Sequence, residues 1–429
     1  MTVFEIEGGQ PLYGEVTLAG AKNAALPMLF AGCLSDDETV LEGVPTGLGD
    51  VIETVAMLRQ LGAFIATEGD TVRIRRGDFP NGLSAGPYSK TRCSLLLLGL
   101  GAALGETVRI AYPGGCEIGK RNHDIHLDGL RALGAKVREE EREIELSGGL
   151  CRGAEIELRY PSSTGTINLV LAAVLADGDT LIRNPSLKPE VRDVLTMLGE
   201  MGAEVATGRN EIMVSGVRQL HGARYRVMSD RLVAATVIAG VAMTRGQAMI
   251  GGASLAPISV EARAWRNAGM MLQETVGGVL AQMVERPAPI SIQTGPYPMF
   301  HSDIQPLHGA MMTLAGGKSR IVETVFDSRF GYLDELHKMG AGAKVRDGGF
   351  VCANGQPGQI AEIRGVRILK GANVTAPDIR GGAALVVGGL AADGITIVGN
   401  VGQIDRGYER IEELMALLGG RIRRREAVA

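Results

Sequence analysis

Aromatic residues are scarce in this sequence, and so are cysteines. Phe, Trp and Tyr make up 4% of the 429 residues, whereas apolar residues make up 45%. The cores must therefore be built from Ala, Val, Leu, Ile and Met. The five cysteines are scattered and odd in number, and no two form a CxxC pair. We therefore expect neither a disulfide framework nor a metal site.

Three further absences narrow the class of protein. The formal net charge is −4, without the basic excess typical of nucleic-acid-binding proteins, so we expect no nucleic-acid partner. The most apolar run, residues 95–104, has about half the length that a membrane span needs. Residues 1–7 contain no basic or apolar segment of a secretory signal. We therefore expect a cytoplasmic protein with no membrane partner.

A short pattern recurs along the chain. Leu-Arg-Gln-Leu-Gly-Ala ends at Ala63, and Leu-Arg-Ala-Leu-Gly-Ala ends at Ala135. Its copies are spaced roughly 70 residues apart. A glycine just past an apolar helix is typical of a C-cap, so each copy predicts the end of a helix. The six copies carry Gly62, Gly134, Gly202, Gly269, Gly340 and Gly419.

The surroundings of this pattern repeat as well. Small-residue apolar segments such as 169–176 and 384–392 precede it, and alternating segments such as 143–146 follow it. This order predicts a unit of helix, strand, helix and strand pair. A solenoid is the alternative for any repeat, but solenoid units are much shorter. At 429 residues we expect an α/β protein of two domains with three units each.

A glycine-rich loop carries the first candidate for chemistry. Residues 112–121 read Tyr-Pro-Gly-Gly-Cys-Glu-Ile-Gly-Lys-Arg, which places Cys116 close to Lys120 and Arg121. Neighbouring positive charge favours the reactive thiolate. An incidental surface cysteine is the alternative.

Two other segments hold isolated polar residues. Lys22 and Asn23 open a predicted helix, and a helix N-terminus with a lysine can bind an anion. Taken alone, the motif is better explained by an ordinary solvated lysine. Asp303, in Phe-His-Ser-Asp-Ile-Gln, could act as a general base or cap the following helix.

Four arginines stand near unit boundaries. Each alone is explained by a structural ion pair, but together they would suit a substrate with both a phosphate and a carboxylate. They are Arg92, Arg329, Arg380 and Arg406.

Together these motifs resemble the UDP-N-acetylglucosamine enolpyruvyl transferases of bacterial cell-wall synthesis, sisters of the shikimate-pathway enolpyruvyl transferase. The resemblance extends from Gly-Ala-Lys-Asn-Ala-Ala-Leu-Pro at residue 20 to Ile-Asp-Arg-Gly-Tyr-Glu-Arg at residue 404. It implies two inverse α/β barrel-like domains of three repeats each. Residues 22–228 would form the domain with the cysteine loop. Residues 1–21 and 229–429 would form the second, completing an inter-domain cleft.

The resemblance also implies a reaction. The enolpyruvyl group of phosphoenolpyruvate would pass to a hydroxyl of a uridine nucleotide, by addition and elimination through a tetrahedral ketal that releases phosphate. No cofactor is implied. Cys116 would protonate the methylene carbon, Asp303 would accept the hydroxyl proton, and Lys22, Asn23 and Arg406 would contact the reacting groups. Further substrate contacts would come from Arg92, Arg121, Asn122, Asp124, Ile125, Ser162, Ser163, Thr164, Val325, Arg329 and Arg380.

The acceptor pocket departs from the family pattern. Where the family usually reads Pro-Val-Asp-Leu-His after the loop arginine, residues 122–126 read Asn-His-Asp-Ile-His, and Tyr160 replaces a usual lysine. We therefore expect either the 3-hydroxyl of UDP-N-acetylglucosamine, for peptidoglycan synthesis, or UMP, for nucleoside-antibiotic synthesis. An inactive binding paralogue is a third reading, and the retained Lys22, Cys116 and Asp303 argue against it.

Overall fold

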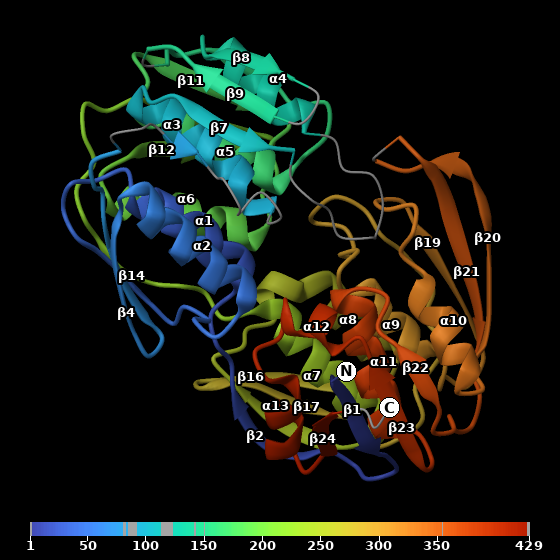
Figure 1. The fold of residues 1–429 in the computed structure, drawn as a ribbon. Helices are drawn as coiled ribbons and strands as arrows, with labels where there is room; N and C mark the ends of the chain where they lie inside the picture. The colour runs from blue at the N-terminus through green and yellow to red at the C-terminus, as the bar shows by residue number, and fades with distance from the viewer. Residues whose placement is uncertain are drawn as a thin grey trace. The chain divides into compact units, whose positions relative to one another are not determined.

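A computed structural model describes residues 2–79, 83–84, 92–112, 123–140, 143–149, 151–353 and 355–426. These residues divide into two compact units (Figure 1). The N-terminal unit comprises residues 19–112 and 123–228, and the C-terminal unit comprises residues 2–18 and 229–426. Each unit encloses a hydrophobic core of its own, built mainly from aliphatic side chains and Met.

Strands form three four-stranded sheets in the described part of each unit. Those of the N-terminal unit are β3 (Thr39–Glu42), β4 (Phe64–Glu68), β5 (Thr71–Arg75), β6 (Leu83–Ser84), β7 (Val108–Ala111), β8 (Lys136–Glu139), β9 (Glu143–Ser147), β10 (Glu155–Glu157), β11 (Asp179–Arg183), β12 (Glu204–Thr207), β13 (Glu211–Ser215) and β14 (Arg224–Arg226). Those of the C-terminal unit are β1 (Thr2–Glu7), β2 (Tyr13–Thr17), β15 (Gln247–Gly251), β16 (Met271–Thr275), β17 (Gly278–Gln282), β18 (Ile292–Gln293), β19 (Lys318–Glu323), β20 (Gly342–Val351), β21 (Pro357–Arg364), β22 (Asn373–Thr375), β23 (Ile395–Gly399) and β24 (Arg421–Glu426).

All six sheets share one pairing scheme. An edge strand runs parallel to its neighbour, and two antiparallel strands complete the sheet, as in the orders β10-β11-β13-β12 and β22-β23-β1-β24. The unit expected from the sequence lacks this parallel edge strand. In most sheets it has only two or three residues, too few for an alternating pattern to be recognised. Because β1 pairs with both β23 and β24, the two ends of the described chain meet in one sheet.

Two kinds of helix alternate along the chain. The first kind is buried nearly all round, and the second is amphipathic and lies over a sheet. The N-terminal unit contains α1 (Lys22–Gly32), α2 (Gly49–Leu61), α3 (Leu96–Leu104), α4 (Asp124–Ala132), α5 (Ser163–Ala173) and α6 (Pro189–Glu200). The C-terminal unit contains α7 (Arg231–Thr244), α8 (Ser259–Asn267), α9 (Gln305–Met312), α10 (Gly331–Lys338), α11 (Ile379–Ala391), α12 (Val401–Asp405) and α13 (Ile411–Leu417).

The buried helices form the centre of each core. In the N-terminal unit α3 packs against both α1 and α5, and in the C-terminal unit α7, α9 and α11 all pack against one another. The predicted helix ends are confirmed, because all six repeat glycines adopt positive φ angles, from 80° at Gly419 to 116° at Gly62. A residue with a Cβ atom would be strained there. No helix in the described ranges is long and apolar enough to cross a membrane.

Candidate active site

Most of the predicted site residues lie where helices begin. Lys22 and Asn23 open α1, Ser163 opens α5 and Asp124 opens α4, while Arg380 lies in the first turn of α11. At a helix start several backbone N–H groups have no partner within the helix, and the helix dipole is positive. Lys22 in the N-terminal unit and Arg380 in the C-terminal unit therefore add positive charge to helix starts whose N–H groups also favour anions.

Lys22 is buried against an acid from the next helix. Its Nζ lies 2.9 Å from Oδ2 of Asp50, and the two side chains are 7% and 15% exposed. Because Asp50 belongs to the first turn of α2, this ion pair joins the starts of α1 and α2. The alternative of a solvated lysine is therefore wrong. Asn23, next to it, is exposed.

Arg329 holds three acceptors in the C-terminal unit. Its Nη2 lies 2.5 Å from Oδ1 of Asp303, and its Nη1 lies 3.3 Å from Oδ1 of Asp378. Its Nε donates to the carbonyl oxygen of Ser302 at 3.2 Å. Burial acts to lower the pKa of this guanidinium, but Asp378 and Asp303 outweigh that effect and raise it. Arg329 is 1% exposed, so residues 302 and 303 are held by a guanidinium group that lies in the interior of the unit.

The Asp303 carboxylate pairs with Arg329. The N-cap residue of α9 is Ile304, which makes no side-chain cap hydrogen bond. The backbone N–H of Asp303 donates to Nδ1 of His301 at 3.0 Å. Asp303 is only partly buried.

One N–H group of the Arg380 guanidinium is buried without a hydrogen-bond acceptor among the described residues. Its guanidinium carbon lies 5.0 Å from the ring centroid of Tyr408, and its Nη1 has no hydrogen-bond partner among the described residues. Burial acts to lower the pKa of Arg380, but Tyr408, Asp303 and Asp230 outweigh this effect, so the pKa lies above its usual value. A buried N–H without an acceptor is costly, and an anionic ligand would satisfy it. Asp378 caps α11 by accepting from the N–H groups of Arg380 and Gly381.

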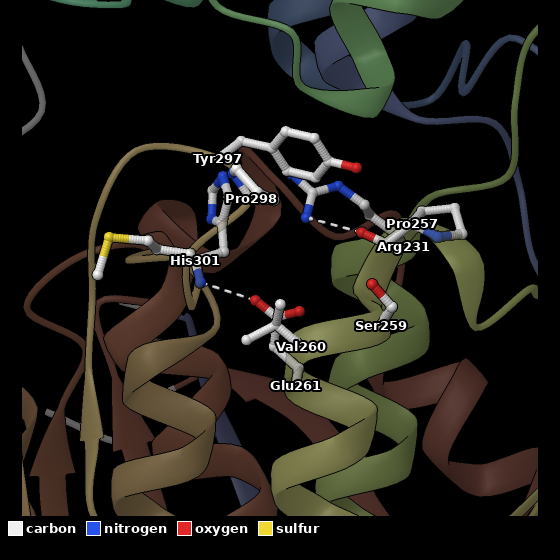
Figure 2. A pocket seen from close by; sticks show the side chains of 9 residues that line it. Arg231, Pro257, Ser259, Val260, Glu261, Tyr297, Pro298 and His301 are labelled. Atoms are coloured by element: carbon white, nitrogen blue, oxygen red, sulfur yellow. Dashed lines mark hydrogen bonds between the residues drawn. The ribbon is translucent and has the colours of Figure 1, made fainter. Parts of the chain in front are cut away.

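A small pocket adjoins the Asp303 segment (Figure 2). Within it the N–H of His301 donates to Oε1 of Glu261 at 2.7 Å, and Nη1 of Arg231 donates to the carbonyl oxygen of Pro257 at 3.5 Å. Burial raises the pKa of the Glu261 carboxyl, against the hydrogen bond from His301 and the charge of Arg231. The pocket is lined by Arg231, Pro257, Ser259, Val260, Glu261, Tyr297, Pro298, Met299 and His301.

The predicted nucleotide contacts of the N-terminal unit form two local clusters. Ser162 caps α5 by accepting from the N–H of Gly165 at 3.1 Å, and the hydroxyl of Ser163 lies 3.0 Å from that of Ser186. Asp124 pairs with Arg159 at 2.7 Å. Thr164 and Ile125 are half-buried beside them.

Two comparisons show the family of this chain. The model of the EPSP synthase (3-phosphoshikimate 1-carboxyvinyltransferase) family matches residues 6–415. UDP-N-acetylglucosamine 1-carboxyvinyltransferase 2 of Caldanaerobacter subterraneus subsp. tengcongensis is 38% identical over 425 residues, 98% of this chain and 99% of that protein. The chain belongs to the EPSP synthase family of enolpyruvyl transferases. The resemblance drawn from the motifs around Lys22, Cys116 and Arg406 is thereby confirmed, and so is the enzyme class.

Solved structures confirm the expected fold of this enolpyruvyl transferase. The enolpyruvyl transferase NikO from Streptomyces tendae superposes with a TM-score of 0.86 at 22% identity, covering 100% of this chain and 99% of that one. An EPSP synthase from Acinetobacter baumannii superposes with a TM-score of 0.78 at 18% identity, covering 99% and 100%. At these identities the likeness concerns the fold alone.

Several predicted site residues of the transferase are not described by the structure, or only in part. Cys116, Arg121 and Asn122 lie outside the described residues, and of Arg92 only the backbone is described, in a 3-10 turn before α3. The ring centroids of Tyr112 and His123 lie 4.9 Å apart. Arg406 follows α12, where its Nη1 donates to the side chain of Gln403 at 3.5 Å.

Residues missed by the sequence analysis support those that it found. Asp50 holds Lys22, Asp378 holds Arg329, and Glu323 accepts the N–H of Val325 at 2.9 Å. Asp378 could have been found, because it stands two residues before Arg380 as a helix N-cap. Asp50 lies 28 residues from Lys22 and leaves no local signal. In the described ranges no group of three or more His, Cys, Asp or Glu side chains could hold a metal ion.

Proposed function

We propose that this chain transfers the enolpyruvyl group of phosphoenolpyruvate to the 3-hydroxyl of UDP-N-acetylglucosamine, which would place it in peptidoglycan precursor synthesis. The observation that carries this proposal is the 38% identity, over nearly the full length of both chains, to a transferase named for that sugar nucleotide. The motifs around Lys22, Asp303 and Arg406 support the proposal, because the resemblance assigns these three residues to the reaction.

In the first step Asp303 takes the proton of the acceptor hydroxyl while the hydroxyl oxygen bonds to C2 of phosphoenolpyruvate. Cys116 delivers a proton to C3, so that the double bond becomes a methyl-bearing tetrahedral ketal. In the second step C3 returns a proton to the Cys116 thiolate, the bond from C2 to the phosphate oxygen breaks, and the departing phosphate takes the proton held by Asp303. The products are an enol ether and inorganic phosphate, and no electrons enter or leave.

The positive side chains serve the charges of phosphoenolpyruvate. Its phosphate and carboxylate need several donors at once, and guanidinium groups offer paired N–H donors for both. Arg380 supports this proposal because its Nη1 is buried and has no partner among the described residues. Lys22 supplies a further charge at the start of α1, where backbone N–H groups reinforce it. We assign Arg92, Arg121, Arg329 and Arg406 to the same task.

The segments that depart from the family pattern are proposed to bind the acceptor nucleotide. We propose that it is contacted by Asn122, Asp124, Ile125, the turn of residues 162–164, and Val325. Asn23 would lie beside the reacting groups. The unusual sequence at residues 122–126 favours testing UMP as a second acceptor.

We propose further that residues 22–228 and residues 1–21 with 229–429 act as the two domains of the enzyme. Two separate hydrophobic cores support this division. We also propose a cytoplasmic location, with phosphoenolpyruvate and the uridine nucleotide as the only substrates and without a nucleic-acid or membrane partner. Cell fractionation tests the location directly.

Purified enzyme, phosphoenolpyruvate and UDP-N-acetylglucosamine form the direct test. We expect phosphate to appear in step with a product whose NMR spectrum shows two vinyl protons of an enol ether. Omitting the nucleotide should stop phosphate release. If phosphate never appears with any uridine nucleotide, the transfer function proposed here is wrong.

A further inference from the structure

Glu323 is a buried carboxylate that the proposed reaction does not use. It is the last residue of β19, and its side chain is fully buried. Burial raises its pKa, against the N–H of Val325 and the charge of Arg329. An interior carboxylate is costly unless donors surround it, so its hydrogen bonds indicate what it stabilises.

One carboxylate oxygen of Glu323 accepts three hydrogen bonds. The hydroxyl of Ser302 donates at 3.0 Å, the N–H of Val325 at 2.9 Å and the N–H of Phe326 at 3.2 Å. Ser302 immediately precedes Asp303. Glu323 therefore ties the segment that carries the proposed base to the connection between β19 and α10.

The same two segments are joined a second time. Arg329, at the end of that connection, donates to the carbonyl oxygen of Ser302 and pairs with the carboxylate of Asp303. Ser302 is thus held at its hydroxyl by Glu323 and at its carbonyl by Arg329. Removal of the Ser302 hydroxyl would leave the segment held by Arg329 and by the hydrogen bond from His301 to Glu261, but no longer joined to Glu323.

We propose that Glu323 is a positioning residue that fixes Asp303 relative to Val325 through the hydroxyl of Ser302. The inference rests on the proposed function, in which Val325 contacts the acceptor and Asp303 takes its proton. Glu323 thereby sets the distance between the acceptor hydroxyl and the base. A base must lie within hydrogen-bond reach of the proton it removes, so a small displacement lowers turnover.

Ser302→Ala isolates this link, because it removes one hydroxyl and leaves the carboxylate with its two N–H donors. We expect kcat to fall by about tenfold or more, with the acceptor KM changed by less than about twofold. Ser319→Ala is the matched control. Ser319 lies on β19, the strand that ends at Glu323, and it is as buried as Ser302. The hydroxyl of Ser319 has no hydrogen-bond partner among the described residues. Its kcat should equal that of the parent.

A double-mutant cycle shows whether the link acts through Asp303. Combined with Asp303→Asn, which removes the base, Ser302→Ala should lower kcat by less than about a further twofold. An equal loss in both backgrounds would overturn the proposal, because the hydroxyl would then act elsewhere. Unchanged kcat in Ser302→Ala would overturn it as well. An inactive parent would instead refute the proposed function first.

Two substitutions of Glu323 complete the test. Glu323→Gln keeps an oxygen that can accept the three donors, so kcat should stay within about threefold of the parent. Glu323→Ala also frees the N–H groups of Val325 and Phe326, so it should raise the acceptor KM as well as lower kcat. Equal kcat losses in both variants, with tryptophan fluorescence unchanged, would show that the charge matters rather than the positioning.

Discussion

Arg329 and Asp303 form an ion pair with 2.5 Å between a guanidinium nitrogen and a carboxylate oxygen. Asp378 shares the same guanidinium, and Arg329 is 1% exposed. The proposed base is therefore attached to a charge that the protein itself keeps away from water. This arrangement makes Arg329 part of the framework of the site as well as a candidate substrate contact.

Removal of Arg329 should destabilise the C-terminal unit. Arg329→Met leaves two carboxylates near each other without their counter-charge, and breaking a buried pair costs about 3–5 kcal/mol. Urea denaturation followed by fluorescence measures this, because the single tryptophan, Trp265, is fully buried in the same unit. Arg346→Met is the control, since its pair with Glu362 has side chains that are 52% and 57% exposed. A loss no larger than that of Arg346→Met would contradict the account.

Asp303→Asn should abolish chemistry more than binding. The amide cannot take a proton from the acceptor hydroxyl, so we expect turnover to fall by about hundredfold or more, the usual scale of general base catalysis. The acceptor KM should change little. Steady-state phosphate release measures both constants, and tryptophan fluorescence checks that the unit stays folded. Normal turnover would leave Asp303 with a structural role alone.

Cys116 should be the cysteine that alkylates fastest. Burial raises the pKa of Cys33 to about 12 and the pKa values of Cys151 and Cys352 to about 11. Their thiolates are therefore scarce at neutral pH. Cys93 is half-buried.

Peptide mass spectrometry after brief iodoacetamide or fosfomycin treatment locates the adduct, and we expect it on Cys116. Cys116→Asp should keep part of the activity and resist both reagents, because a carboxyl group can also deliver a proton. An adduct found first on another cysteine would remove the case for Cys116 as the acid.

His308 should make the C-terminal unit sensitive to acid. Burial lowers its pKa from 6.5 to about 4, against a hydrogen bond to the carbonyl oxygen of Ile290. Between these pH values the unfolded chain binds a proton that the folded chain does not. The free energy of unfolding therefore falls as the pH drops, by about 3 kcal/mol in total for this residue.

His308→Gln should reduce that fall, since an amide does not titrate. Urea midpoints from Trp265 fluorescence, taken between about pH 7 and pH 4, measure the difference. His337→Gln, at an exposed position of the same unit, should follow the parent. If the two variants show the same pH dependence, the lowered pKa of His308 is wrong.

Local rules explain what the sequence predicted of the fold. The preference of glycine for a left-handed backbone at the end of a helix is local, so it can be predicted from the sequence alone. Gly62 and Gly419 adopt positive φ angles as expected. The periodicity of residues 143–146 likewise suffices for β9. Strands such as β10 and β22 could not be predicted, because three residues are too few to show an alternation of apolar and polar side chains. Their pairing also depends on a strand farther along the chain.

The same limit applies to the site. The motifs pointed to Lys22, Asp303 and Arg329, but not to the acids that hold them. Asp378 is 49 residues from Arg329, and Asp50 is 28 residues from Lys22. Only folding brings such pairs together. The ion pair of Asp303 with Arg329 likewise joins side chains 26 residues apart.

A competition between acceptors tests the central claim most directly. The enzyme receives phosphoenolpyruvate with equal concentrations of UDP-N-acetylglucosamine and UMP, and mass spectrometry measures the initial rates of both enol ethers in one tube. We predict that the product of the sugar nucleotide exceeds that of UMP by at least about tenfold, since a pocket built for the sugar gains binding energy from it. A product made mainly from UMP would contradict the assigned acceptor.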